Sequence, residues 1–126
     1  IVRSTISNAS NGAQLTALKC LQDPATTQQM RRNKKILQER YEIVKETLKQ
    51  HAEYATYFEA LPFNSGYFMC IQLKQHDAHT IRKKLIAEYS TGVIAMGNRL
   101  RVAYAGVNCE KIEKVFKNVY ECCKKG

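Results

Sequence analysis

The stretch that decides the fold is Gly97-Asn98-Arg99-Leu100-Arg101-Val102-Ala103-Tyr104-Ala105-Gly106. Its large apolar side chains stand at every second position, at Leu100, Val102 and Tyr104. Because strand side chains alternate between two faces, this spacing predicts a β-strand over residues 100–105 with one face turned to a core. The Gly-Asn pair in front of it predicts a tight turn from a preceding strand.

Arg101 lies on the other face of this predicted strand. Its neighbours along that face are Ala103 and Ala105, which leave open space around the guanidinium. A guanidinium pairs well with a carboxylate or a phosphate, because its planar fork of N–H donors matches their oxygens. An arginine near a strand end also extends its charge into water, and geometry alone favours that interpretation.

The flanking sequence predicts the remaining elements. Strands are expected at residues 67–73 and 92–96, and helices at 13–21, 24–51, 78–89 and 109–123. A narrow apolar stripe runs along the long helix, at Leu37, Tyr41, Val44 and Leu48. Such a helix is expected to link two bodies. The predicted fold is α/β (an α+β sandwich), with a small three-stranded sheet backed by helices and preceded by a long linking helix.

The composition narrows the class of protein. The chain has 126 residues, 44% of them hydrophobic, and a net charge of +9, which is ordinary for one soluble globular domain. No apolar run approaches the ~20 residues of a membrane span, so no membrane is expected as a partner. The five cysteines are odd in number and include adjacent Cys122-Cys123. This usage favours a reducing compartment, the cytoplasm.

The residues alone show no complete active site. The basic residues occur in short groups such as 31–35, which are typical of solvated helix faces, so nucleic-acid binding is not favoured. His76 and His79 flank Asp77 at a spacing that allows metal binding, but no second ligand group accompanies them, and no metal is expected. Ser7 and Asn8 precede a helix, where such residues either cap it or bind an anion.

Four segments carry a family likeness when their order and spacing are taken together. They are Ile1-Val2-Arg3-Ser4-Thr5-Ile6-Ser7-Asn8-Ala9-Ser10-Asn11-Gly12-Ala13, Asn64-Ser65-Gly66-Tyr67-Phe68-Met69, Gly92-Val93-Ile94-Ala95 and Arg99-Leu100-Arg101-Val102-Ala103-Tyr104-Ala105-Gly106. In this order they resemble the C-terminal part of the class I/II aminotransferases, which are fold-type-I pyridoxal phosphate enzymes. The resemblance covers essentially the whole chain.

The resemblance implies a domain organisation and a substrate site. Residues 1–22 would be a remnant of the large cofactor-binding domain, 23–52 a long interdomain helix, and 53–126 the small domain that closes over the cofactor. In the family, a strand arginine of this small domain binds the substrate α-carboxylate. Arg101 matches that position, with Arg99 as the alternative if the register differs by two residues.

The resemblance also implies contacts across a homodimer. The loop that contains Ser7 and Asn8 resembles the segment that reaches the partner's active site, which makes these two residues candidate cofactor ligands across the dimer. Arg3 matches the position that binds the distal carboxylate in the dicarboxylate-specific branch, although the family's proline in this loop is replaced here by Ala9-Ser10. Phe68 lies near the position that packs at the substrate pocket.

The same resemblance implies that the chain is a fragment, inactive alone and without catalytic residues of its own. The lysine that attaches pyridoxal 5'-phosphate lies upstream in the family, and no lysine here matches it. The whole enzyme is expected to move an amino group between an amino acid and a 2-oxo acid. Two alternatives remain open, a standalone module that binds a small carboxylate and a basic nucleic-acid-binding domain.

Overall fold

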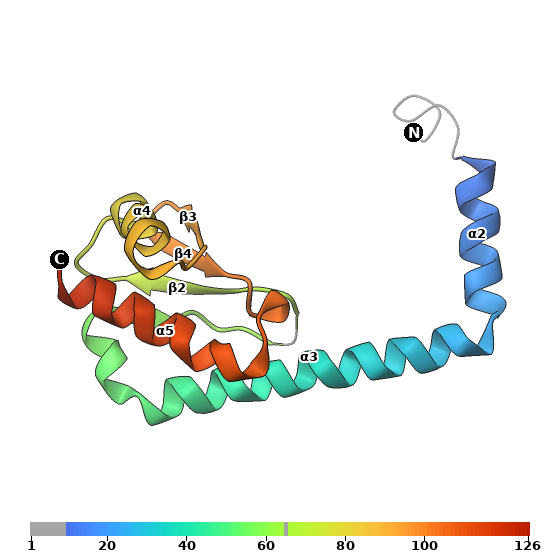
Figure 1. Cartoon of the computed structure of the whole chain (residues 1–126), viewed down its shortest axis with the longest axis horizontal. Helices are drawn as coiled ribbons and strands as arrows, with labels where there is room; N and C mark the ends of the chain where they lie inside the picture. Colours follow the sequence, from blue (N-terminus) through green and yellow to red (C-terminus); the bar gives the residue numbers. More distant parts are fainter. Residues whose placement is uncertain (1–9, 65) are drawn as a thin grey trace. The chain divides into compact units, whose positions relative to one another are not determined.

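The computed structural model describes residues 10–64 and 66–126 (Figure 1). The chain divides into two compact units, Ile1–Lys35 and Ile36–Gly126. Three predicted site residues, Arg3, Ser7 and Asn8, lie outside the described residues.

The first unit contains helix α2 (Asn11–Gln22) and the beginning of α3 (Pro24–Gln50). Ser10 starts α2, and its hydroxyl accepts a hydrogen bond from the Ala13 amide at 3.4 Å. Asp23 starts α3 by accepting from the Ala25 amide at 2.8 Å, with proline in the first helical position. None of the residues of α2 is buried. Both helices that the sequence predicts in this part of the chain are present, and α2 is longer than the predicted helix over residues 13–21.

The second unit is built on a four-stranded antiparallel sheet in the order β1-β2-β4-β3. The strands are β1 (Phe58–Ala60), β2 (Met69–Leu73), β3 (Ile94–Met96) and β4 (Arg99–Val102). The prediction of three strands was wrong because it missed β1. That strand has three residues and one buried side chain, Phe58, so it carries no readable alternation. It follows the 3-10 helix η1 (Ala52–Thr56).

The deciding strand is shorter than predicted. β4 ends at Val102, and the 3-10 helix η2 (Tyr104–Gly106) takes the place of its expected last residues. The predicted turn into β4 is present, and Gly97 has a positive φ of 58°. That backbone conformation suits glycine at the first position of a two-residue hairpin loop.

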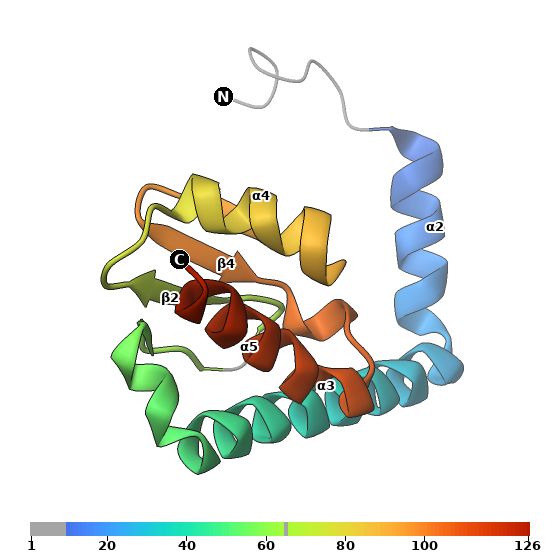
Figure 2. The same cartoon turned by 60° about the vertical axis from the view of Figure 1, so that its left-hand side comes forward.

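Helices α4 (Ala78–Tyr89) and α5 (Cys109–Lys124) cover one face of the sheet, as Figure 2 shows. The strand residues of that face, Met69, Ile71, Leu100 and Val102, are at most 2% exposed. The second half of α3 adds Val44 and Thr47 to the buried side chains. Of the predicted stripe on α3, Val44 is buried, and Tyr41 and Leu48 pack partly buried against the core of this unit. The opposite face of the sheet is not covered by α4 and α5.

Asp77 caps α4 and gives a prediction for pH dependence. Its carboxylate accepts hydrogen bonds from the Thr80 amide at 2.8 Å and the Thr80 hydroxyl at 2.9 Å, and these bonds hold its pKa below the usual 3.8. Because the folded pKa is lowered, the ionised cap stabilises the fold above about pH 4, and this stabilisation is lost as pH falls through the folded pKa. We expect Asp77→Ala to lower the urea midpoint near neutral pH, with a difference that narrows in acid. A difference that is constant with pH would contradict the role of the charge.

Candidate functional site

Arg101 lies on the sheet face that α4 and α5 do not cover. Its cross-strand partners are Cys70 on β2 and Ile94 on β3, and side chains directly opposite in antiparallel strands share a face. The expectation that only Ala103 and Ala105 neighbour Arg101 on this face was wrong, since both alanines lie beyond the end of β4. The neighbours come from the adjacent strands, and strand pairing is the signal that would have found them.

Phe68 supports the guanidinium of Arg101. The guanidinium carbon lies 4.4 Å from the centroid of the Phe68 ring, a cation–π distance. Phe68 is 49% exposed and Arg101 half-buried, so the pair remains accessible. A guanidinium stacked in this way keeps the N–H donors at its edge available to a planar anion. The structure therefore brings together two of the predicted substrate-binding residues.

Arg101 has no anionic partner within the described residues. The ion pairs found there all involve His51, and none of the described oxygens accepts a hydrogen bond from the Arg101 guanidinium. A half-buried cation with free directional donors is suited to hold a carboxylate from outside the chain.

Arg99, the alternative carboxylate ligand, is engaged differently. Its Nε donates to the Gln72 side-chain oxygen at 3.0 Å, and the Gln72 amide nitrogen donates to the Asn98 carbonyl, also at 3.0 Å. These bonds hold Arg99 against β2 at the hairpin end of the sheet. The geometry therefore favours Arg101 over Arg99 as the ligand of an external anion.

The cysteines provide no activated nucleophile in the core. All five are unpaired, and Cys122 and Cys123 are buried. Burial raises the pKa of Cys122, and it raises that of Cys123 to about 12. These two thiols are therefore protonated at neutral pH and pack as small apolar groups.

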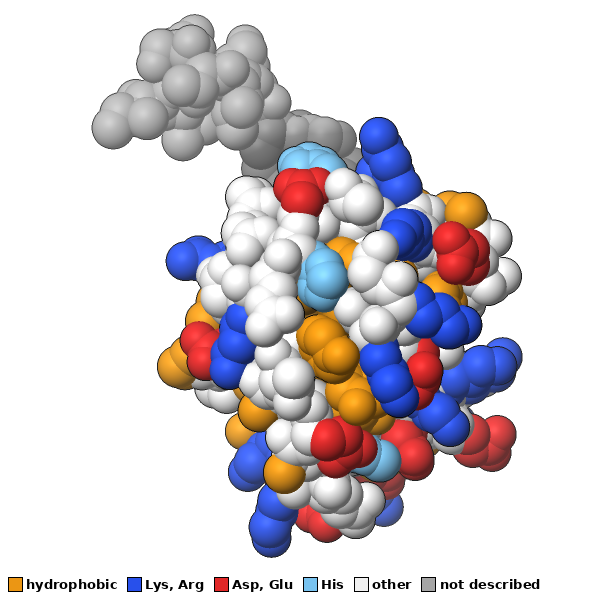
Figure 3. All heavy atoms as spheres, turned by 90° about the vertical axis from the view of Figure 1, so that its left-hand side faces the viewer, with side chains coloured by type: hydrophobic (Ala, Val, Ile, Leu, Met, Phe, Trp, Pro, Cys, Tyr) orange, Lys and Arg blue, Asp and Glu red, His pale blue; other side chains and the backbone are white. Residues whose placement is uncertain are grey.

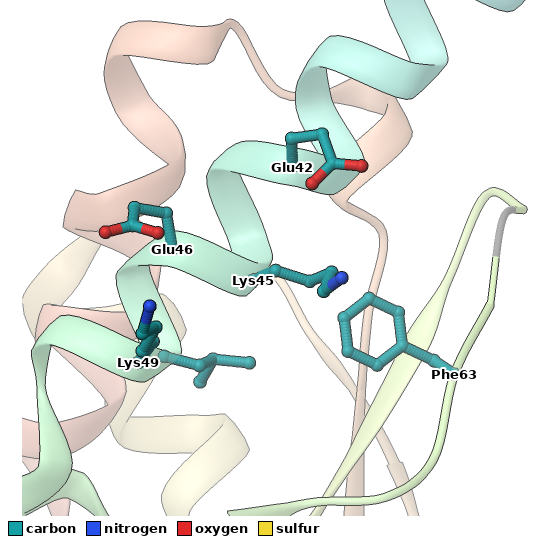
Figure 4. Close-up of a pocket in the computed structure, with 6 residues that line it drawn as sticks. Glu42, Lys45, Glu46, Lys49 and Phe63 are labelled. Atoms are coloured by element: carbon teal, nitrogen blue, oxygen red, sulfur yellow. The ribbon is translucent and has the colours of Figure 1, made fainter.

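A surface pocket lies beside the second half of α3, away from Arg101. It is lined by Glu42, Lys45, Glu46, Leu48, Lys49 and Phe63. Figure 4 shows Lys45 extending toward the ring of Phe63. Two acidic and two basic side chains give this pocket no net preference for an anion, and none of the predicted site residues lies in it.

Other kinds of site find little support in the described part of the chain. Residues 10–64 and 66–126 contain no group of three or more His, Cys, Asp or Glu side chains arranged to hold a metal ion. No described helix combines the length and apolarity needed to cross a bilayer. On the face seen in Figure 3, acidic and uncharged side chains lie between many of the Lys and Arg side chains. That arrangement differs from a continuous basic track for nucleic acid.

Comparison with known proteins gives the family of this chain. The family model "Aminotransferase class I and II" matches residues 1–119. The fold is similar to an aminotransferase from Anaerococcus prevotii DSM 20548, with a TM-score of 0.78 and 22% identity over 96% of this chain and 28% of that one. It is also similar to an aromatic aminotransferase from Pyrococcus horikoshii OT3, with a TM-score of 0.71 and 15% identity over 98% of this chain and 34% of that one.

The chain spans about a third of the length of these two solved structures, at 28% and 34%. No curated protein sequence matches it. The family match covers nearly the whole chain. The chain belongs to the class I and II aminotransferases.

Proposed function

We propose that this chain is the C-terminal part of a pyridoxal phosphate-dependent aminotransferase and that Arg101 binds the α-carboxylate of the amino acid substrate. The observation that carries the proposal is the Arg101 guanidinium, stacked on Phe68 on an uncovered sheet face and free of any described acidic partner. Within this family, an unpaired arginine of that kind fits the one charged group that all α-amino acids and 2-oxo acids share.

The contribution of these residues is to bind and orient. A bidentate pair with Arg101 fixes the carboxylate and so limits rotation of the substrate about its Cα. Phe68 keeps the guanidinium plane in place while that pair forms. Pyridoxal phosphate, when bound, supplies the electron sink that makes the Cα–H bond acidic. The resemblance to the family places the cofactor lysine upstream of this segment, and no lysine here matches it, so we assign attachment of the cofactor to a part of the enzyme outside this chain.

The domain roles and the dimer contacts belong to the same proposal. Residues 1–22 are assigned to the large domain, 23–52 to the interdomain helix and 53–126 to the small domain. In a homodimer, Ser7 and Asn8 would contact the cofactor of the partner subunit, and Arg3 would bind a distal substrate carboxylate. The five unpaired cysteines support a reducing compartment such as the cytoplasm.

The test uses the protein produced from the whole reading frame that contains this segment, supplied with pyridoxal phosphate. Amino-group transfer from amino acids to 2-oxo acids is expected, and no turnover is expected from the 126-residue chain alone.

Calorimetric titration of the chain with amino acids and 2-oxo acids tests the alternative that the chain is a standalone module that binds small carboxylates. Micromolar binding by the chain together with an inactive whole protein would favour a small-carboxylate binding module. A gel shift that weakens steeply with added salt would favour nucleic-acid binding.

Phe68→Leu tests the support of the guanidinium. A cation–π contact contributes about 0.5–2 kcal/mol, so the variant is expected to raise KM for the amino acid about two- to thirtyfold. Binding of the cofactor should not change. Ile86→Ala is the control, because Ile86 is as exposed as Phe68, at 49%, and lies on α4, which covers the other face of the sheet. Equal effects of the two substitutions would argue against a specific role for the stack.

A further inference from the structure

Helix α3 makes a direct contact with the turn that follows the arginine strand. The Arg40 side chain donates from Nη1 to the carbonyl oxygen of Ala105, in η2. Arg40 is half-buried, and its Nε is a buried donor without an acceptor among the described residues. The Arg40 side chain therefore makes a specific hydrogen bond to one backbone oxygen of the turn.

The same turn is bonded to the segment that carries Phe68. The amide of Ala105 donates to the carbonyl oxygen of Tyr67 at 3.3 Å, and Tyr67 directly precedes Phe68 in the chain. The peptide groups around Ala105 therefore connect Arg40 on one side to the Phe68–Arg101 stack on the other. The stack depends on this segment because both Tyr67 and Phe68 lie before the first residue of β2 and lack the support of the strand ladder.

Aromatic packing holds α3 against the same turn. The ring of Tyr41 lies 5.3 Å from that of Phe63, and the ring of Phe63 lies 6.2 Å from that of Tyr104, both in edge-to-face geometry. Tyr104 is 1% exposed, so this packing fixes the position of η2 but does not contact the uncovered sheet face. Arg40 is the polar component of the contact, and it fixes the direction of the Ala105 carbonyl.

From these contacts we infer that Arg40 is a positioning residue for substrate binding. It acts through the Ala105 peptide and Tyr67 to keep Phe68 beneath the Arg101 guanidinium, and it does not touch the substrate itself. The inference rests on the proposed role of Arg101. It adds a residue on the long helix, more than sixty positions away in the sequence, to the machinery that orients the carboxylate.

Arg40→Met in the whole enzyme is the first test. KM for the amino acid is expected to rise about fivefold, as for a residue that acts on the substrate site through a network of contacts. KM does not depend on how many molecules are folded, so a purely structural role would leave it unchanged. Arg40→Lys keeps a donor for the carbonyl and should recover most of the affinity. Arg82→Met is the control, because Arg82 is a half-buried helix arginine whose side chain makes no hydrogen bond to any of the described residues.

A double-mutant cycle with Phe68→Leu identifies the route of the effect. If Arg40 acts through the stack, Arg40→Met should change KM less than twofold once Phe68 is leucine. Fully additive effects, or an unchanged KM in Arg40→Met, would overturn the inference. If Arg40→Met yields no folded enzyme, Arg40→Gln takes its place in the same cycle. Arg101→Lys is measured alongside. A normal KM in Arg101→Lys refutes the proposed function. A raised KM in Arg101→Lys together with a normal KM in Arg40→Met refutes only the role of Arg40.

Discussion

Replacing Arg101 by lysine in the whole enzyme is expected to lower kcat/KM for amino acids by about thirty- to several-thousandfold. Truncating one partner of a hydrogen-bonded charge pair costs about 2–5 kcal/mol, which sets this range. Lysine keeps the charge but presents it as a point with rotating donors, so the two parallel hydrogen bonds to the carboxylate are lost. Arg101→Ala removes the charge as well, so its loss of kcat/KM should lie at the upper end of this range.

The structure explains why charge alone should not rescue the lysine variant. The guanidinium carbon of Arg101 lies over the Phe68 ring, 4.4 Å from its centroid, and a planar cation can hold this position while its N–H donors remain free for the substrate. An ammonium over the same ring would direct its donors in all directions. The carboxylate would then be bound without a fixed orientation, and the gain from positioning the Cα–H bond would be lost with it.

Arg99→Lys is the matched control for this experiment. Arg99 lies two residues earlier on the same face of β4, but its Nε is bonded to Gln72. Its replacement should leave kcat/KM within a few-fold of the wild-type value, and neither variant should release the cofactor. A larger loss of kcat/KM for Arg99→Lys than for Arg101→Lys would assign carboxylate binding to Arg99. Normal kinetics in both variants would mean that the carboxylate site does not lie on β4.

The elements that the sequence predicted correctly are those whose burial repeats over many residues. The apolar stripe of α3 and the apolar side of α5, which includes Ile112, Phe116 and Val119, recur over several turns, so their helical period can be read directly. β1 could not be read, because three residues with one buried side chain show no period. The end of β4 was misjudged for a related reason. Tyr104 is buried like Leu100 and Val102, and it continues the period of two although the backbone has already turned into η2.

The site was predictable only in part. Arg101 stood out because the strand predicted over residues 100–105 is otherwise apolar, and the family resemblance indicated what it binds. Cys70 and Ile94 follow from strand pairing, which local sequence does not specify. Arg40 gave no signal at all: a charged residue next to the stripe residue Tyr41 is typical of a helix edge exposed to water. Its bond to Ala105 joins positions far apart in the chain, and only the folded structure shows such a contact.

Phe116→Ala is expected to lower the free energy of unfolding of the chain by about 3–5 kcal/mol. Phe116 is 0% exposed and lies on the face of α5 that covers the sheet. Its removal loses the transfer free energy of the ring and leaves a cavity that close-packed neighbours fill only partly. Since a domain of this size has a total stability of about 5–15 kcal/mol, the variant should lose between about a fifth and all of that stability.

Urea denaturation of the chain measures this loss, and Lys117→Ala, at the neighbouring exposed position, is the control with little expected change. A loss below about 1 kcal/mol would mean that α5 does not cover the sheet in solution. The two large effects should also separate cleanly. Phe116 acts on the covered face of the sheet and Arg101 on the uncovered one. In the whole enzyme, Phe116→Ala should therefore reduce the amount of active protein while KM of the folded molecules stays normal, and Arg101→Lys should raise KM at unchanged stability.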